Sequence, residues 1–308
     1  MAGYDLHREL KRMECHFNWQ LDCRTSSTLK KLQQNLEDRL RCGCSWMRHL
    51  YNDLGYVLHA QGLEDEALEV LIKGQKYIKA ETEDQEDCSL LINQANMAWV
   101  YYHKGELEKS RACLEEVRRL QQEFLTPKGS QVHPVLSAQK GWTLMRFENS
   151  HKRRAIECFK MALAGDPEKK NFHKGLALAM QKNDFKANPE QREMIDQLRV
   201  ARDMYENEDV CLGALYLMSL LAHGDKCEEA LDEANKLADK LIKSGRISGL
   251  SNLSSLYTYH LKNYDKAISV TEEMQEKFPQ STRVTKNLAS CLKFKEYARI
   301  PAGHTDAN

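Results

Sequence analysis

The chain has 308 residues, in which 45 lysines and arginines balance 45 aspartates and glutamates. This balance excludes a globally basic nucleic-acid-binding tail and an acidic solvating protein, and the length exceeds what one compact core usually manages. The 6 prolines and 15 glycines are too few for a turn-rich all-β protein, and no run of about 18 apolar residues predicts a membrane span. We therefore expect a mostly helical cytoplasmic protein, without a membrane partner, built as two domains or as a repeat array.

The first fifty residues are expected to form helices that precede the repeats. Residues 1–10 include Asp5, Arg8 and Glu9 and lack the apolar core of a secretory signal. Ten cysteines are scattered along the chain without any CxxC pair, so we expect free thiols and no metal site. Only Cys42 and Cys44 stand close together, and a regulatory or intermolecular role is the alternative for these two.

Six copies of one hydrophobic pattern follow from residue 51 to residue 279. The first copy places large and small residues at the spacing of a tetratricopeptide helix pair: Tyr51, Leu54, Gly55, Leu58, Ala67, Leu71 and Gly74. The later copies begin near Gln94, Gly141, Asn171, Leu217 and Ser251. Turn residues fall between paired helices at Gln61-Gly62, Lys104-Gly105, His223-Gly224-Asp225 and Lys262-Asn263. The pattern predicts an all-α tetratricopeptide-repeat α-solenoid, a superhelix of helix-turn-helix hairpins whose concave wall binds a partner.

The copies divide the chain into five predicted segments. These are N-terminal helices (1–50), the first tetratricopeptide repeats (51–182), a linker helix with the middle repeat (183–250), the last repeat with a capping helix (251–297), and a disordered tail (298–308). The fourth copy has a longer linker before its second helix, which is expected over about residues 190–206. Extra turns or long loops are expected at 80–88 and 124–134.

The balanced net charge conceals blocks of one sign. Residues 137–202 carry fourteen bases and eight acids, a net charge of +6, and residues 240–299 carry eleven bases and five acids, again +6. Residues 61–90 and 203–239 have net charges of −6 and −8. Solvated helix faces can produce such swings. If the basic blocks instead converge across a superhelix, they form the footprint expected for a phosphate backbone.

Sequence signatures of catalysis are missing. The chain contains no GxxxxGK[ST], GxGxxG, HExxH or GxSxG motif, and its 11 histidines are spread singly. We therefore expect a protein that is not an enzyme and that needs no cofactor or metal.

Two stretches carry more than a generic repeat signal. They include the strings Glu14-Cys15-His16-Phe17-Asn18-Trp19 and Asn96-Met97-Ala98-Trp99-Val100-Tyr101-Tyr102-His103. With the stretches at residues 51–59 and 140–147, they resemble the interferon-induced proteins with tetratricopeptide repeats, a family of antiviral effectors. The resemblance is close over about residues 8–182 and traceable to about 295. Family members usually continue for about half as long again, so the chain looks like a shortened member lacking the C-terminal repeats.

The resemblance implies a binding site for RNA ends. Members of the family bind single-stranded RNA in a basic bore and recognise a 5′-triphosphate or an incompletely methylated cap. The family's RNA-binding positions correspond here to Arg146, Lys182, Lys152, Gln34, Lys286 and Asn287. Asp38 departs from the pattern, because a carboxylate repels phosphate. Neither Arg146 nor Lys182 occupies a core position of its repeat, so charge reversal at either is expected to leave folding intact.

The resulting hypothesis is a non-catalytic antiviral RNA sensor. Its partner would be single-stranded RNA with a 5′-triphosphate or cap, and not DNA, while other family members or host proteins are further partners. The alternative is a tetratricopeptide adaptor of the innate immune response that binds proteins and no RNA. The departure at Asp38 favours this alternative, as does Asn252-Leu253, which stands where the family has an Arg-Tyr pair.

Overall fold

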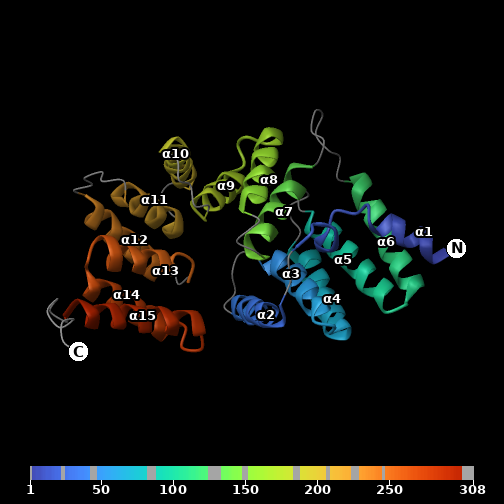
Figure 1. Ribbon diagram of the computed structural model, residues 1–308, viewed down its shortest axis with the longest axis horizontal. Coiled ribbons are helices and arrows are strands. Elements are labelled where there is room, and N and C mark those ends of the chain that lie inside the picture. Colours follow the sequence, from blue (N-terminus) through green and yellow to red (C-terminus); the bar gives the residue numbers. More distant parts are fainter. Residues whose placement is uncertain are drawn as a thin grey trace, which may run out of the picture. The chain divides into compact units, whose positions relative to one another are not determined.

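The structure, a computed structural model, describes residues 2–21, 25–41, 47–81, 88–123, 133–147, 152–182, 188–205, 209–222, 229–244 and 247–299. Over these ranges it contains helices and the segments that join them, with no strand (Figure 1). The chain divides into two compact units, Met1–Asn183 and Asp184–Asn308. Among the described helices, none is both long and apolar enough to cross a membrane.

Three helical hairpins form the body of the first unit. They are α3 (Met47–Ala60) with α4 (Glu64–Glu81), α5 (Ser89–His103) with α6 (Leu107–Glu123), and α7 (Pro134–Phe147) with α8 (Lys152–Gly165). A further helix, α9 (Lys170–Lys182), packs against α8 and α7. These helices correspond to the first three predicted repeats and to the first helix of the fourth.

Three N-terminal elements precede the hairpins and pack on them. They are α1 (Ala2–Leu10), the short 3₁₀ helix η1 (His16–Asn18) and α2 (Ser26–Arg41). α1 contacts α5 and α6, η1 contacts α3 and α5, and α2 contacts α3. The segment that carries the family-like string therefore lies against the first two hairpins.

The small residues of the predicted pattern lie where paired helices approach most closely. Ala67 and Ala155 are fully buried, and a Cβ atom added to Gly55 would lie 2.5 Å from Cγ of Leu71. Real Cβ atoms essentially never lie that close to another atom, so a larger residue at position 55 would force the Leu71 side chain to move. The predicted turn residue Gly62 has a φ angle of +78°, a left-handed conformation that favours glycine.

The second unit begins with α10 (Asn188–Met204), which packs against α11. Two hairpins follow: α11 (Val210–Ala222) with α12 (Ala230–Ser244), and α13 (Leu250–Ser255) with α14 (Tyr264–Lys277). α13 continues as a π-helical turn, Leu256–His260. At the predicted turn after it, Lys262 has a φ angle of 54° and the Asn263 side chain accepts a hydrogen bond from the Lys266 amide at 3.2 Å. The last helix, α15 (Thr282–Arg299), packs on α14.

The two helices of the fourth predicted repeat belong to different units, so its pairing as a hairpin stays a prediction. Its two helices exist as α9 and α10, close to the predicted boundaries, but α9 packs within the first unit and α10 within the second. The division after Asn183 falls between them.

Some predicted features lie outside the described residues. They are the close pair Cys42 and Cys44, the turn at residues 223–225, most of the two long loops, and the tail from residue 300. The division into two units is near the predicted boundary at residue 182, and the finer five-segment organisation stays a prediction.

Candidate nucleic-acid interface

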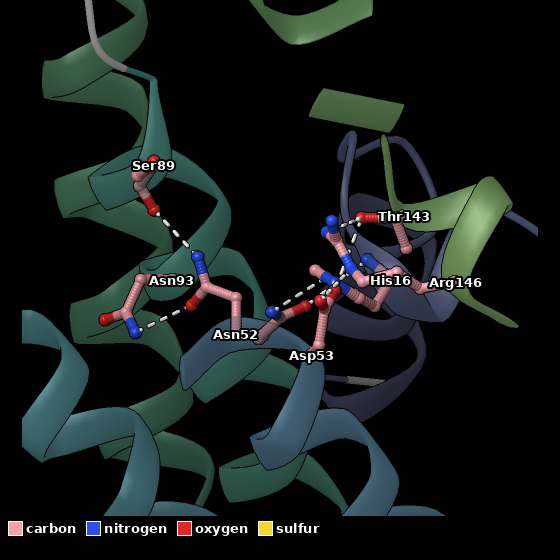
Figure 2. Close-up of polar contacts among 8 residues, drawn as sticks. His16, Asn52, Asp53, Ser89, Asn93, Thr143 and Arg146 are labelled. Atoms are coloured by element: carbon pink, nitrogen blue, oxygen red, sulfur yellow. Dashed lines mark hydrogen bonds and ion pairs between the residues drawn. The ribbon is translucent and has the colours of Figure 1, made fainter. Parts of the chain in front are cut away.

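Arg146, on α7, pairs with a carboxylate that is fully buried. Its side chain is only 12% exposed, and its Nε forms an ion pair with Oδ2 of Asp53 on α3. Thr143, one turn earlier on α7, donates a hydrogen bond to Oδ1 of Asp53 at 3.4 Å and accepts one from Nη2 of Arg146 at 3.5 Å. Figure 2 shows these side chains converging on Asp53. Arg146 therefore joins two repeats in addition to carrying a charge.

His16 completes this cluster from the N-terminal segment. Its ring Nε2 lies 2.9 Å from Oδ1 of Asp53, and its Nδ1 lies 3.1 Å from Nδ2 of Asn96 on α5. The His16 backbone amide donates to Oδ1 of Asn96 at 3.3 Å, which leaves the Asn96 amide nitrogen facing the ring. Because that nitrogen can only donate, Nδ1 of His16 accepts and Nε2 donates to Asp53. One histidine side chain thus joins α3 to α5.

The buried carboxylate of Asp53 is ionised, and its partners in the cluster stabilise the charge. Burial alone would raise the pKa of Asp53, but the Arg146 guanidinium and the hydrogen bond from His16 outweigh it and lower the pKa to about 2. Asp53 is therefore ionised at neutral pH, and its charge balances that of Arg146. The guanidinium of Arg146, which was predicted to contact phosphate, is therefore already paired with the carboxylate of Asp53.

The stability of the first unit is expected to fall in acid. A carboxylate whose pKa is depressed by folding stabilises the native state above its unfolded pKa, about 4, and loses that contribution as the pH falls. For Asp53 the loss should occur between about pH 4 and pH 2. Urea unfolding followed by tryptophan fluorescence at several pH values tests this, with Asp53→Asn as the comparison. If both proteins lose stability equally over this range, Asp53 is not the responsible group.

A strap of the N-terminal segment, residues 14–20, spans several hairpins through polar contacts. Glu14 accepts a hydrogen bond from the Trp19 indole at 2.6 Å and lies 3.4 Å from Nζ of Lys140 on α7. Nη2 of Arg154, on α8, donates to the Trp19 carbonyl at 2.8 Å. Two cations of the basic block 137–202 therefore bind the chain's own strap.

Aromatic packing fixes the same strap on the first two hairpins. The Phe17 ring stacks 5.6 Å from the Trp99 ring of α5 and lies 5.2 Å, edge on, from the Tyr56 ring of α3. Its centroid is 4.7 Å from the His59 ring. Aromatic pairs at these distances stabilise beyond the area they bury. The family-like string around His16 and Phe17 is thus explained by packing and hydrogen bonding within the fold.

A second buried network lies beside the first (Figure 2). Asn52 donates to the Ser89 carbonyl at 3.1 Å and accepts from Nδ2 of Asn93 at 2.9 Å. Gln139 of α7 donates to Oγ of Ser89 at 2.8 Å. Because these polar side chains are buried and bonded to one another across the hairpins, they fix the order and spacing of the three hairpins.

The other predicted residues of the first unit take different positions. Gln34 is exposed on α2, and Asp38 on the same helix is buried, 3.9 Å from Nη2 of Arg41. Lys152 is the first residue of α8 and Lys182 the last of α9, and the side chains of both lie outside the described part of the chain.

Lys286 and Asn287 belong to the second unit, on α15. Lys286 is exposed, whereas Nδ2 of Asn287 donates to Oγ of Ser254 on α13 at 2.8 Å. The side-chain amide of Asn287 is therefore occupied within the unit. Of the six predicted residues, the structure shows Arg146 and Asn287 making internal bonds and Gln34 and Lys286 facing solvent.

The sequence interpretation missed Asp53, Asn96 and Thr143. A usable signal existed, because Asp53 and Asn96 stand at equivalent places in the first two repeats, 43 residues apart, amid apolar residues. A charged or amide residue on the apolar face of a repeat needs a buried partner. The sequence alone does not reveal that His16 and Arg146 are those partners.

The described cysteines are free thiols, as predicted: Cys15, Cys88, Cys113, Cys158, Cys211 and Cys291. Burial raises the pKa of Cys15 to about 12, so this thiol is unreactive. Within the described ranges, no group of three or more histidine, cysteine, aspartate or glutamate side chains could hold a metal ion.

Solved structures share this fold over nearly the whole chain. A structure described as a human IFIT1 dimer with m7Gppp-AAAA superposes with a TM-score of 0.77 at 20% identity, covering 95% of this chain and 64% of that one. A human IFIT1 dimer with PPP-AAAA gives 0.76 at 20% identity, covering 97% and 64%. The predicted all-α tetratricopeptide-repeat fold is confirmed, so the class is a tetratricopeptide-repeat protein.

Sequence comparison identifies the relatives. No family model matches the chain. Interferon-induced protein with tetratricopeptide repeats 3 of Mus musculus is 30% identical over 251 residues, which are 77% of this chain and 59% of that protein. Interferon-induced protein with tetratricopeptide repeats 2 of Mus musculus is 27% identical over 296 residues, covering 93% and 59%. The chain is therefore a homologue of the interferon-induced proteins with tetratricopeptide repeats, and the predicted resemblance is confirmed. It spans about 59% of the length of these relatives.

Proposed function

We propose that the chain is a non-catalytic, cytoplasmic protein of antiviral defence that binds the 5′ end of single-stranded RNA. The observation that carries the proposal is its homology to the interferon-induced proteins, together with the likeness of its fold to IFIT1 structures that contain m7Gppp-AAAA or PPP-AAAA. The human homologue named antiviral innate immune response effector IFIT1 is 24% identical over 92% of this chain.

The charge pattern supports an anionic partner. The block 137–202 has a net charge of +6, and Lys152 and Lys182 stand within it. We assign the phosphate contacts first to these two lysines, with Gln34 as a further position in the same unit, while Lys286 and Asn287 of the second unit stay sequence predictions. Arg146 is assigned a secondary part, because Asp53 balances its charge. A triphosphate or a cap brings several negative charges to such a site.

Binding is expected to depend on the 5′ end and on salt. Single-stranded RNA with a 5′-triphosphate should bind more tightly than the same strand with a 5′-hydroxyl. The same strand with a cap is measured as a third ligand. Each phosphate neutralised on a single strand contributes about −0.7 to the slope of log affinity against log salt. Fluorescence anisotropy at two salt concentrations measures both effects. Equal binding of blunt duplex, or a slope near zero, would contradict the proposal.

A protein adaptor without RNA binding is the second candidate. The neutralised Arg146 and the buried carboxylate of Asp38 favour it, because each lowers the positive potential at a predicted RNA position. The RNA proposal stands first because it rests on the homology to the interferon-induced proteins and on the likeness of the fold.

A further inference from the structure

One side of α15 carries basic and aromatic residues together. At about 100° per residue, Arg283, Lys286, Lys293 and Tyr297 fall within about 80° of the helix circumference. All four are exposed, and 55% of Tyr297 is open to solvent. The acidic residue of this helix, Glu296, falls outside that sector by the same count.

Neighbouring rings extend this side into a continuous aromatic surface. Tyr259, on the π-helical turn and 47% exposed, packs edge on against Phe294 with ring centroids 4.9 Å apart. Phe294 in turn lies 6.5 Å from Tyr297, and Nζ of Lys293 lies 5.4 Å from the centre of the Tyr297 ring. We define the α15 patch as Tyr259, Arg283, Lys286, Lys293, Phe294 and Tyr297.

The basic residues of the α15 patch differ from Lys295 of the same helix in the contacts that they make. Lys295 points to the opposite side of α15 and pairs with Asp265 at 2.5 Å. Lys293 instead lies beside an exposed aromatic ring. Three cations and two exposed tyrosines thus share a surface on which α15 contributes no carboxylate.

We propose that the α15 patch binds the body of single-stranded RNA, beyond the 5′ end. Aromatic side chains beside lysines are the arrangement that binds single strands, because bases stack on the rings while the cations meet the phosphates. Charge complementarity excludes a basic partner, and the alternation of rings and cations fits a chain of alternating bases and phosphates better than an acidic peptide. The inference rests on the proposed function and adds a second contact surface to it.

The test compares a short and a long RNA with the same 5′-triphosphate end, of about 4 and about 20 nucleotides. The parent chain should bind the long RNA more tightly. Tyr297→Ala should weaken the long RNA about five- to tenfold, because one stacked base is lost. Lys293→Glu should make the slope of log affinity against log salt less negative by about 0.7 for the long RNA. Both variants should bind the short RNA like the parent.

Two control variants isolate the patch. Leu292→Ala changes an exposed residue about 140° away from Tyr297 on the same helix. Lys73→Glu reverses an exposed lysine of α4, which is paired with Glu69 in the first unit. Both controls should bind the long RNA like the parent.

Several outcomes overturn the inference. One is that Tyr297→Ala and Lys293→Glu bind the long RNA like the parent, and another is that Leu292→Ala loses as much affinity for the long RNA as Tyr297→Ala. A third is that a polyglutamate peptide displaces the long RNA at equal affinity, which would assign the patch to a protein partner. Failure of the proposed function looks different. The short RNA would then bind equally with a triphosphate or a hydroxyl, while the long RNA still depended on Tyr297.

Discussion

Arg146→Glu is expected to lower the free energy of unfolding of the first unit by about 3–5 kcal/mol. The change removes the cation that balances Asp53 and places a second carboxylate beside it, and a buried charge left unpaired costs about that much. The sequence alone predicts a tolerant surface position, and the burial of Asp53 reverses that expectation. All four tryptophans, at positions 19, 46, 99 and 142, belong to the first unit, so urea unfolding followed by tryptophan fluorescence reports on it.

Two further variants separate the ion pair from other causes. Asp53→Asn combined with Arg146→Met removes both charges but keeps a carbonyl oxygen that accepts from His16 and Thr143, and it should recover most of the lost stability. Arg119→Glu, at an exposed site of α6, should change stability by no more than about 0.5 kcal/mol. An Arg146→Glu chain that unfolds at the parent's urea midpoint would show that the ion pair does not form.

Local features of the fold were predictable because their causes are local. A left-handed turn needs glycine or a similar residue, and Gly62, Gly105 and Lys262 have positive φ angles at the predicted turns. The spacing of Ala67 and Gly55 reflects the close approach of neighbouring helices, so it marks the hairpin in the sequence as well as in space. The limits of the helix predicted over about residues 190–206 were accordingly close to those of α10.

Features that depend on distant contacts were not predictable. The helices α9 and α10 follow each other in sequence yet belong to different units, since each buries its apolar side against other helices. The role of Arg146 depends on Asp53, and Thr143 of the same helix is 90 residues from that carboxylate. His16 stands in the family-like string at residues 14–19, and only its bonds to Asp53 and Asn96 explain why it is there.

The site is therefore less cationic around Arg146 than its composition indicates. Lys140 lies near Glu14, and Arg154 binds the carbonyl of Trp19, so part of the basic block holds the strap in place. A count of charges in the sequence treats every base as available for a ligand. The bases at the helix ends, Lys152 and Lys182, become the sharper test of RNA binding, because they are separated from Asp53 by sequence and by helix.

Lys182→Glu is expected to weaken binding of 5′-triphosphate single-stranded RNA about ten- to hundredfold. Losing one charge-assisted contact costs roughly 1.5–3 kcal/mol, and the new carboxylate adds repulsion. Lys152→Glu should act in the same direction. Because Lys182 ends α9, the last helix of its unit, the reversal should leave the tryptophan-detected unfolding curve unchanged, unlike Arg146→Glu. Arg119→Glu, where the arginine pairs with Glu116 at 2.8 Å outside the basic block, is the matched control and should bind like the parent. If Lys182→Glu and Lys152→Glu remain folded and bind RNA as the parent does, the RNA proposal fails and the adaptor becomes the better account of the chain.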